Sequence, residues 1–277
     1  MTEKKIISNT DRPLTIDSLC RSLSNIGVES GDTLLVHSSL SSLGWVCGGA
    51  QSVILSLKKA LGTGGTLVMP AHSSGWSDPA KWENPPVPLE WVQTIYDNLP
   101  PFEQKMTPTL GMGVIAELFR TIPGSLRSAH PQVSFSANGK FAEKIVSGHN
   151  LTPKFGMQSP LARLYDLDAK VLMLGVGYDS CTCFHLSEAL IGNLPVQRAG
   201  TAILENGERV WKWFEDYDYD ADDFELIGNA FEQDGQVHSA RIGNANCRLF
   251  SIKHAVDFAK IWLMQNRVAD QKKSTLA

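Results

Sequence analysis

The segment DTLLVHSSLSSLGWVCGGAQSVILSLKKALGTGGTLVMP, residues 32–70, sets the expected fold. An apolar run at 33–36 reads as a buried strand, and a helical pattern follows that ends at Gly62. A second apolar run at 65–70 reads as the next strand. Strand, helix and strand at this spacing predict a βαβ unit with parallel strands. KVLMLGV at 170–176 predicts a third buried strand, so we expect an α/β fold with a mostly parallel central sheet.

Around this unit the patterns predict one domain over residues 1–277. Residues 1–13 read as a loose tail, and residues 71–89, rich in Ser, Pro and Trp, read as an ordered lid. After Pro195 we expect a C-terminal antiparallel insertion, 196–250, which begins with a hairpin that turns at 205–207. It continues through the acidic segment EDYDYDADD, 215–223. Helices are expected at 14–27, 89–99, 112–120, 159–167, 224–231 and 255–264, and further strands at 133–137 and 247–252.

The composition limits the classes of partner. The chain has 25 basic and 29 acidic residues and a net charge of −4. This charge argues against nucleic acid as the main partner and is compatible with a cationic small molecule. Five scattered cysteines form no disulfide framework. The chain starts without a signal-peptide pattern and has no run of 18 apolar residues, so we expect a cytoplasmic protein, monomer or homodimer, without a membrane partner.

The stretch YDSCTCFHLSEAL, residues 178–190, concentrates reactive side chains in the loop after the third strand. Cys181, Cys183 and His185 could ligate a metal, but structural zinc sites usually show a second ligand pair, and none is visible. A cysteine near a helix N-terminus could be a nucleophile, although free cysteine is more often a small core residue. We therefore expect no metal.

A histidine base is the third interpretation of this stretch. Open α/β sheets bind ligands beyond the carboxyl ends of their strands, which is where this loop lies. His185 and Glu188 are three residues apart at the start of a predicted helix, so they share a face. A carboxylate beside imidazole fixes its tautomer and stabilises the imidazolium of a general base. An ordinary surface H-x-x-E pair has the same spacing, and spacing alone leaves the two interpretations open.

The chain resembles the aminoglycoside 3-N-acetyltransferases, the antibiotic N-acetyltransferase family. Six segments stand in the family's order: LLVHSSLSSLG (34–44), GTLVMP (65–70), TPTLGMGVIAELFR (107–120), RSAHPQVSF (127–135), SPLARL (159–164) and VLMLGVGYDSCTCFHLSE (171–188). The resemblance implies a three-layer α/β/α sandwich, unlike the GNAT acetyltransferases. It also implies transfer of acetyl from acetyl-CoA to the 3-amine of a 2-deoxystreptamine ring. His185 would be the catalytic base and Glu188 its supporting carboxylate. Residues 197–202 fit the CoA pattern of GNAT enzymes by chance, since they lead into a hairpin strand.

The same resemblance implies a CoA site in the loop after the first strand. Small hydroxyl residues let a backbone approach a ligand and donate hydrogen bonds to it. A plain turn rich in Ser is the alternative, and for Arg127 the alternative is a structural salt bridge. The candidate cofactor contacts are His37, Ser38, Ser39, Leu40, Ser41, Thr109, Gly111, Gly113, Arg127 and Ser128.

Two features bear on the acceptor, which we expect to be a small, cationic amine. The acidic segment, with Glu215 and Asp216, could attract a polycation, or it could cap the helix that follows. His72 and Asp179 could contact the acceptor directly. Some relatives acetylate amines that are not aminoglycosides, so another amine is the alternative acceptor. A CoA-thioester hydrolase and a CoA-binding protein without turnover are further alternatives, although the GxSxG motif of many hydrolases is absent.

Overall fold

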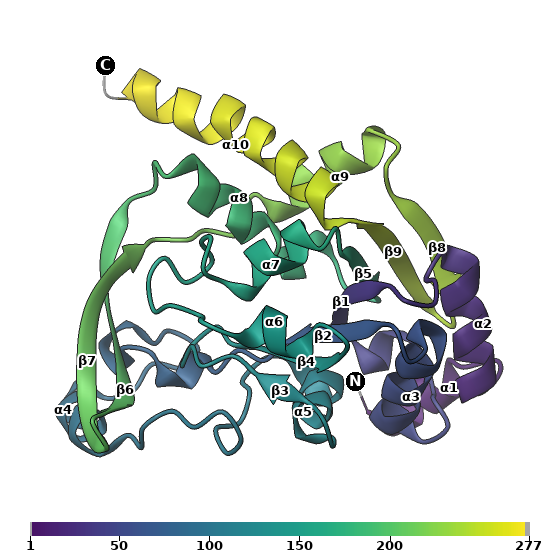
Figure 1. The fold of residues 1–277 in the computed structure, drawn as a ribbon, viewed down its shortest axis with the longest axis horizontal. Coiled ribbons are helices and arrows are strands. Elements are labelled where there is room, and N and C mark those ends of the chain that lie inside the picture. The colour runs from purple at the N-terminus through teal and green to yellow at the C-terminus, as the bar shows by residue number, and fades with distance from the viewer. Residues whose placement is uncertain (1, 275–277) are drawn as a thin grey trace.

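A seven-stranded sheet forms the centre of the molecule, in the order β3-β4-β2-β1-β5-β9-β8 (Figure 1). The computed structural model describes residues 2–274, with side chains described through Arg267. A separate two-stranded sheet consists of β6 and β7. The strands are β1 (Thr33–Ser38), β2 (Thr66–Pro70), β3 (Leu126–Arg127), β4 (Phe135–Gly139), β5 (Lys170–Leu174), β6 (Val196–Glu205), β7 (Glu208–Tyr217), β8 (His238–Ile242) and β9 (Ala245–Ser251).

Helices cover both faces of the central sheet. Successive side chains of a strand point to opposite faces. Accordingly Leu34 and Val36 of β1 belong to one hydrophobic cluster, while Leu35 belongs to the other. The first cluster packs against α2 (Ile16–Ile26), α3 (Gly49–Leu61) and α5 (Gly113–Thr121). The second packs against α6 (Ala142–Val146), α7 (Pro160–Asp166), α8 (Phe184–Ile191), α9 (Phe224–Gln233) and α10 (Ile252–Ser274).

The sheet is mixed, so the prediction of a mostly parallel sheet is wrong. β1 pairs in parallel with β2 and with β5, as the βαβ pattern predicts. The other pairings of the sheet, β2–β4, β3–β4, β5–β9 and β8–β9, are antiparallel. The antiparallel strands lie on both sides of the parallel centre. The carboxyl ends of β1, β2 and β5 therefore still meet at one edge.

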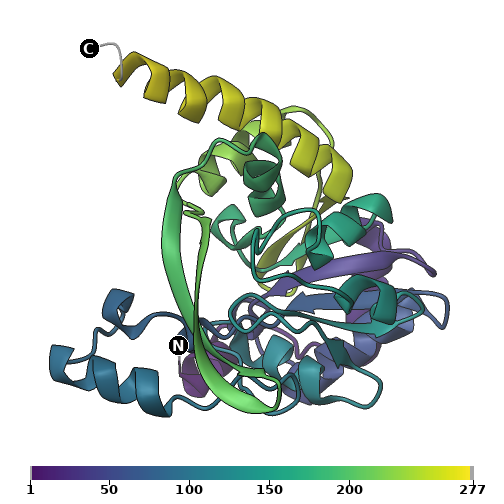
Figure 2. The ribbon, with the colours of Figure 1, turned by 60° about the vertical axis from the view of Figure 1, so that its left-hand side comes forward.

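The predicted insertion after Pro195 divides into two parts. β6 and β7 form a long hairpin that arches beside the body of the molecule (Figure 2). Its two-residue turn is Asn206-Gly207, and both residues have positive φ, as a type I′ turn requires. β8 and β9, in contrast, extend the central sheet beside β5. The insertion is therefore the hairpin with the acidic segment, and it does not run to residue 250.

The N-terminal residues are ordered against the domain, which corrects the prediction of a loose tail. Glu3–Ser8 form helix α1. Beyond it the Thr10 hydroxyl accepts a hydrogen bond from the Trp45 amide at 2.8 Å, and the Asn244 side chain donates to the Asn9 carbonyl at 2.7 Å. Leu14 forms a parallel bridge with Val46.

The long loop at 71–89 is ordered by contacts with the hairpin and with helix α4 (Leu89–Asn98). Asp78 accepts a hydrogen bond from Tyr96 at 2.6 Å, and Tyr96 packs 4.8 Å from Trp211 of β7. Lys81 donates to the Arg198 carbonyl on β6 at 2.6 Å. The loop, α4 and the hairpin thus form one packed unit at the side of the sheet.

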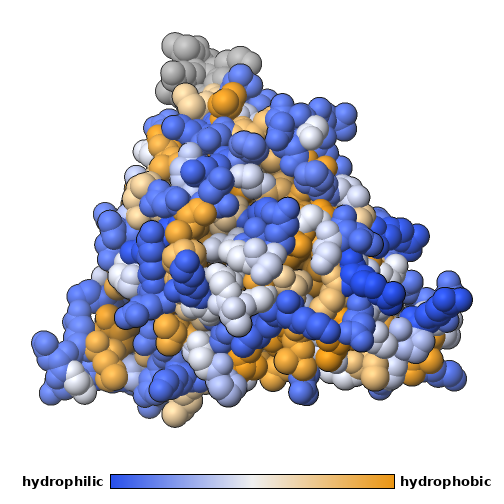
Figure 3. Space-filling view, turned by 45° about the vertical axis from the view of Figure 1, so that its right-hand side comes forward, coloured by the Kyte–Doolittle hydropathy of each residue, from blue (hydrophilic) through white to orange (hydrophobic). Residues whose placement is uncertain are grey.

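The surface in Figure 3 is mostly hydrophilic, with hydrophobic residues gathered toward the lower edge of this face. Within residues 2–274, no helix has both the length and the apolar character needed to cross a membrane.

Candidate active site

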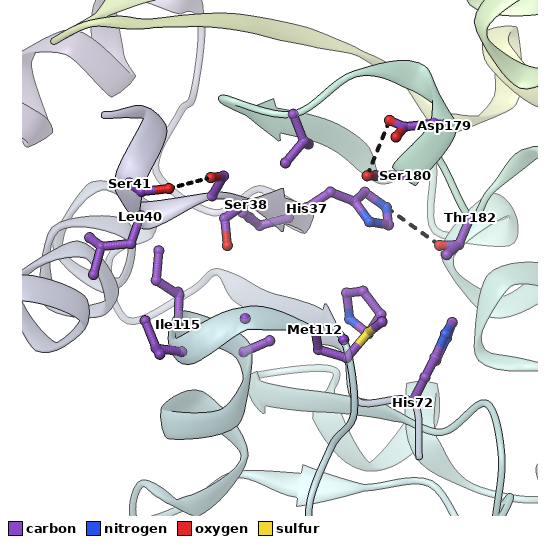
Figure 4. Close-up of a pocket in the computed structure, with 18 of the residues that line it drawn as sticks. His37, Ser38, Leu40, Ser41, His72, Met112, Ile115, Asp179, Ser180 and Thr182 are labelled. Carbon is purple, nitrogen blue, oxygen red and sulfur yellow. Dashed lines mark hydrogen bonds between the residues drawn. The ribbon is translucent and has the colours of Figure 1, made fainter. Parts of the chain in front are cut away.

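A cleft of about 1090 Å³ lies at the sheet edge where the carboxyl ends of β1, β2 and β5 meet. His37 and Ser38 at the end of β1, Pro70 at the end of β2 and Val176 after β5 all line it. Figure 4 shows side chains from these elements and from the start of α5 pointing toward a common space. Ten of the residues predicted for the site line the cleft: His37, Ser38, Ser39, Leu40, Ser41, His72, Gly111, Gly113, Asp179 and His185.

His185 and Glu188 form a close pair at the start of α8. Nδ1 of His185 lies 2.5 Å from Oε2 of Glu188. A carboxylate only accepts hydrogen bonds, so Nδ1 carries a proton, and in the neutral imidazole this tautomer leaves the lone pair on Nε2. His185 lines the cleft, with 14% of its side chain exposed, while the side chain of Glu188 is fully buried behind it. The pair has the geometry of a base and its orienting carboxylate.

Glu188 is held in turn by two further donors. Nη1 of Arg267, on α10, lies 2.6 Å from Oε1 of Glu188, and the Asp220 amide donates to the same oxygen at 3.2 Å. Arg267 also contacts Asp223, at 2.6 Å, and the Asp220 carbonyl, at 2.8 Å. The predicted last helix stops at Met264, so the sequence contains no signal that would have found Arg267.

Aromatic rings fix the imidazole of His185. Phe155 stacks on it with centroids 4.5 Å apart and planes 10° apart. Tyr219 meets its edge at 5.5 Å, and Phe224 packs at 4.7 Å. Phe155, Tyr219 and Phe224 also line the cleft. The ring of His185 therefore has one preferred orientation, with Nδ1 toward Glu188.

Two other histidines of the cleft are neutral. Burial lowers the pKa of His37 to about 3 and that of His72 to about 3. Nε2 of His37 lies 3.4 Å from the Thr182 hydroxyl (Figure 4). Nε2 of His72 has no hydrogen-bond partner among the described residues, and its ring packs against Phe135 and Phe155. Both rings can contact a ligand without bringing charge to the cleft.

The predicted cofactor loop lies along the cleft from β1 to α3. The Ser39 hydroxyl is 2.8 Å from that of Ser42 and 3.4 Å from that of Ser41. Across the cleft Gly113 has φ of +79°, and a Cβ on it would meet the Ser38 carbonyl at 3.8 Å. Trp45, Gly49 and Met112 also line the cleft, although the sequence did not single them out. The serines and glycines of this part of the cleft leave room for an extended ligand.

Three predicted cofactor contacts lie outside the cleft lining. Arg127 is buried, and its five N–H donors go to the Ser134 and Ser73 hydroxyls and to the carbonyls of Ala71, Gln104 and Thr107. No donor is left for a phosphate, and its role is neither the predicted phosphate contact nor a salt bridge. Ser128 is buried against His149, and Thr109 donates to Glu117.

The acidic segment is largely committed to contacts within the chain, and Glu215 and Asp216 do not line the cleft. Asp216 is buried and accepts from Thr152 at 3.1 Å, with Nζ of Lys154 at 3.8 Å. Asp218 accepts from Gln197 at 2.6 Å. Asp223 pairs with Arg267. Asp216, Asp220 and Asp223 thus lie beside cations of the chain, whereas Glu215, Asp218 and Asp222 have no cationic partner among the described residues.

The two cysteines that immediately precede α8 are core residues. Cys181 and Cys183 are fully buried, with sulfurs 3.4 Å apart, and neither forms a disulfide. Burial raises the pKa of the Cys181 thiol well above its usual value. A thiol in this environment is a poor nucleophile. Across the part of the chain that the structure describes, no three His, Cys, Asp or Glu side chains converge as a metal site.

The sequence matches known proteins along its length. It is 45% identical over 271 residues to the SPbeta prophage-derived aminoglycoside N(3')-acetyltransferase-like protein YokD of Bacillus subtilis, covering 98% of this chain and 100% of that protein. It is 32% identical over 280 residues to aminoglycoside N(3)-acetyltransferase VII of Streptomyces paromomycinus, covering 95% and 96%.

Solved structures show the same fold. The crystal structure of YokD from Bacillus subtilis superimposes with a TM-score of 0.94, covering 96% of this chain and 98% of that chain. AAC-IIIb, solved as a binary complex with CoASH, superimposes with a TM-score of 0.81 at 29% identity, covering 92% of this chain and 97% of that chain. AAC-VIa bound to sisomicin superimposes with a TM-score of 0.79 at 29% identity, covering 91% of this chain and 98% of that chain.

The family model described as aminoglycoside 3-N-acetyltransferase matches residues 35–264. This range contains the paired His185 and Glu188 and nearly all of the cleft lining. The chain belongs to the aminoglycoside 3-N-acetyltransferase family.

Proposed function

We propose that the protein transfers an acetyl group from acetyl-CoA to an amine, with His185 as the general base. The observation that carries this proposal is the His185–Glu188 pair, with the imidazole lining the cleft and the carboxylate buried behind it. An amine is a nucleophile only when it is neutral, so an ammonium must lose a proton before it attacks. An imidazole with a free Nε2 suits that task near neutral pH.

In the proposed reaction Nε2 of His185 takes a proton from the acceptor ammonium. The neutral amine attacks the carbonyl carbon of the thioester, and a new C–N bond forms. The C–S bond then breaks: the imidazolium returns its proton to the sulfur, which leaves as a thiol, and the attacking nitrogen releases its extra proton to solvent. Glu188 stabilises the imidazolium that exists between the two proton transfers. Transfer is direct, without an acetylated protein side chain.

We propose that acetyl-CoA lies along the serine loop, His37 to Ser41, and the glycines at 111 and 113. The small residues of this part of the cleft support that placement, as does the family member solved with CoASH. Trp45 and Gly49, at the far end of the loop, are additional candidate contacts. A reaction that consumes acetyl-CoA suits the cytoplasm.

The first acceptor to test is the 3-amino group of a 2-deoxystreptamine aminoglycoside. The names of the relatives and the AAC-VIa complex with sisomicin support this choice. The second candidate is an amine outside the aminoglycosides. It is favoured by a lysine, Lys154, in the cleft lining and by the internal pairing of the acidic segment. His72 and Asp179 are candidate contacts for either acceptor.

A thiol-release assay with acetyl-CoA tests the proposal. The panel contains kanamycin, gentamicin and simple amino sugars, each with wild-type protein and with His185→Ala. Amine-dependent release that the variant loses supports acetyl transfer. Release without any amine would instead indicate a thioester hydrolase. CoA binding without release, unchanged in the variant, would indicate a binding protein.

A further inference from the structure

Lys154 brings a cationic group to the cleft near the proposed base. It precedes Phe155, whose ring stacks on His185. Its Nζ lies 4.9 Å from the centroid of the Tyr219 ring, and the edge of Tyr219 meets His185 at 5.5 Å. Both Lys154 and His185 line the cleft. Among the described lining residues, Lys154 is the only lysine or arginine.

The ammonium of Lys154 is paired incompletely. Its closest carboxylate oxygen, Oδ2 of Asp216, is 3.8 Å away, which exceeds a hydrogen-bond distance. Only 19% of its side chain is exposed, and Nζ donates no hydrogen bond to any described residue within 3.5 Å. Oδ2 of Asp216 also has no hydrogen-bond partner there. An ammonium has three donors, and a largely buried charge is costly unless it is hydrogen-bonded.

We propose that Lys154 binds an anionic group of the acceptor, so that the acceptor is an amine that also carries a phosphate or a carboxylate. The inference rests on the proposed acetyl transfer and names its substrate class. An anionic oxygen would complete the donors of Lys154 in a partly desolvated place, where charge-assisted hydrogen bonds are strongest. The amine of the same molecule would then lie beside His185.

The charges of the cleft fit this class better than a polycation. Asp216 lies 3.8 Å from Lys154, and Asp220 and Asp223 contact Arg267, so each of these carboxylates has a cation beside it. Glu3 and Asp179 are the acidic residues among the described lining, and Asp179 is exposed at the rim. The charge of Lys154 itself would repel a second ammonium placed beside it and attract an anion.

The phosphates of CoA are the competing anions. They lie at the far end of the pantetheine arm from the thioester, while Lys154 lies next to the rings that hold the base. An anion at Lys154 therefore belongs to the molecule that meets the thioester at His185.

Three matched amino sugars test the proposal: glucosamine, glucosamine 6-phosphate and muramic acid, which carries a carboxylate. Kanamycin serves as the polycation. We expect kcat/KM for the wild-type protein to be about 10- to 100-fold higher for an anionic sugar than for glucosamine. A preference for glucosamine 6-phosphate would indicate that Lys154 binds a phosphate, and a preference for muramic acid would indicate a carboxylate.

The variant Lys154→Met should lose this preference: kcat/KM for the anionic sugar should fall by about 10- to 100-fold, and kcat/KM for glucosamine should fall much less. Lys154→Met with Asp216→Asn removes both charges and guards against misfolding caused by an unpaired buried carboxylate. Lys144→Met, an exposed lysine on α6, is the control and should retain the wild-type preference.

Three results would overturn the inference and leave acetyl transfer standing. Kanamycin could be preferred and unaffected by Lys154→Met. The variant could raise the KM for acetyl-CoA, which would assign Lys154 to CoA. It could also lower kcat equally for every amine, which would assign Lys154 to the thioester carbonyl.

If no amine releases thiol, the proposed function fails, and the anion site is then tested by calorimetry with glucosamine 6-phosphate. Binding lost in Lys154→Met supports the site, and absence of binding to wild type overturns it.

Discussion

His185 and Glu188 meet through Nδ1 and Oε2 at 2.5 Å, one turn apart on α8, with the carboxylate fully buried and the imidazole at the cleft. Because Oε1 of the same carboxylate accepts from Arg267, both oxygens of Glu188 are engaged on opposite sides. The imidazole is thus connected through a single carboxylate to the C-terminal helix.

Replacing His185 with Ala should lower kcat by about 10²- to 10⁴-fold, the usual contribution of a general base. The affinity for CoA should not change, because the serine loop is untouched. Stopped-time thiol release measures the first quantity and calorimetry with CoA the second. His238→Ala, on the exposed strand β8, is the matched control and should keep full activity. Retention of most of the turnover by His185→Ala would exclude this base.

Arg267→Met should reduce kcat by roughly tenfold with little effect on KM, because Glu188 loses a charged partner but keeps the Asp220 amide. The stability should also fall, by about 3–5 kcal/mol, since a buried carboxylate is left without its cation. Urea unfolding and steady-state kinetics measure the two effects. Arg241→Met, on exposed β8, is the control. A variant with full kcat and reduced stability would show that Arg267 supports only the fold.

Arg127→Met should destabilise the fold by about 3 kcal/mol or more, because several buried acceptors lose their donors together. In the variant that remains folded, the KM for acetyl-CoA should match that of the wild type. Chemical unfolding and initial-rate kinetics give both values. A large rise in KM for acetyl-CoA with unchanged stability would restore a phosphate-binding role for Arg127.

Acid should destabilise the protein through its buried histidines. Burial lowers the pKa of His37 and of His72 to about 3, and that of His149 to about 4. The unfolded chain binds these protons near pH 6.5, so the stability is complete above that pH and falls as the pH approaches the folded values. Each histidine contributes about 1.4 kcal/mol per pH unit in this window.

His72→Leu tests this dependence, since its Nε2 has no partner to lose among the described residues. The free energy of unfolding, measured in urea between about pH 7 and about pH 5, should fall less steeply in the variant than in the wild type. His254→Leu, at an exposed position, should leave the slope unchanged. Equal slopes in all three proteins would contradict the assignment of His72 as a neutral buried group.

Alkylation should distinguish the exposed cysteine from the buried ones. Iodoacetamide should modify exposed Cys47 within minutes and leave Cys181 and Cys183 unmodified in the native protein. Cys181→Ala should retain acetyl transfer, because its thiol faces the core. Peptide mass spectrometry reports the modified sites. Rapid loss of activity on modification of Cys181 would support the nucleophile that the sequence left open.

The parts of the fold that could be predicted are those with continuous apolar runs. β1, β2 and β5 are such runs, and the parallel orientation of β1 and β2 follows from the helix α3 between them. The antiparallel character of the sheet could not be predicted, because β4 and β9 come from distant segments that each resemble any buried strand. β8 has a polar pattern, with most of its side chains exposed, and gives no strand signal.

The candidate site divides in the same way. His185 and Glu188 are neighbours on one helix, so local spacing suffices to pair them. The role of Arg127 depends on acceptors from three separate segments, and its burial is invisible in RSAHPQVSF. Lys154 lies in an irregular loop, where no periodicity shows which side chains face the cleft. Arg267 and Lys154 contact residues that are distant in the sequence, so their roles can be identified only from the three-dimensional structure.

The bond between Arg267 and Glu188 spans 79 residues of chain. During synthesis the ribosome delivers His185 and Glu188 long before it delivers α10. A nascent chain that has emerged only as far as α9 holds the histidine and its carboxylate but lacks the guanidinium that anchors them. Under the proposed mechanism, full activity is therefore a late event in the life of each molecule, and it is reached when the last helix docks.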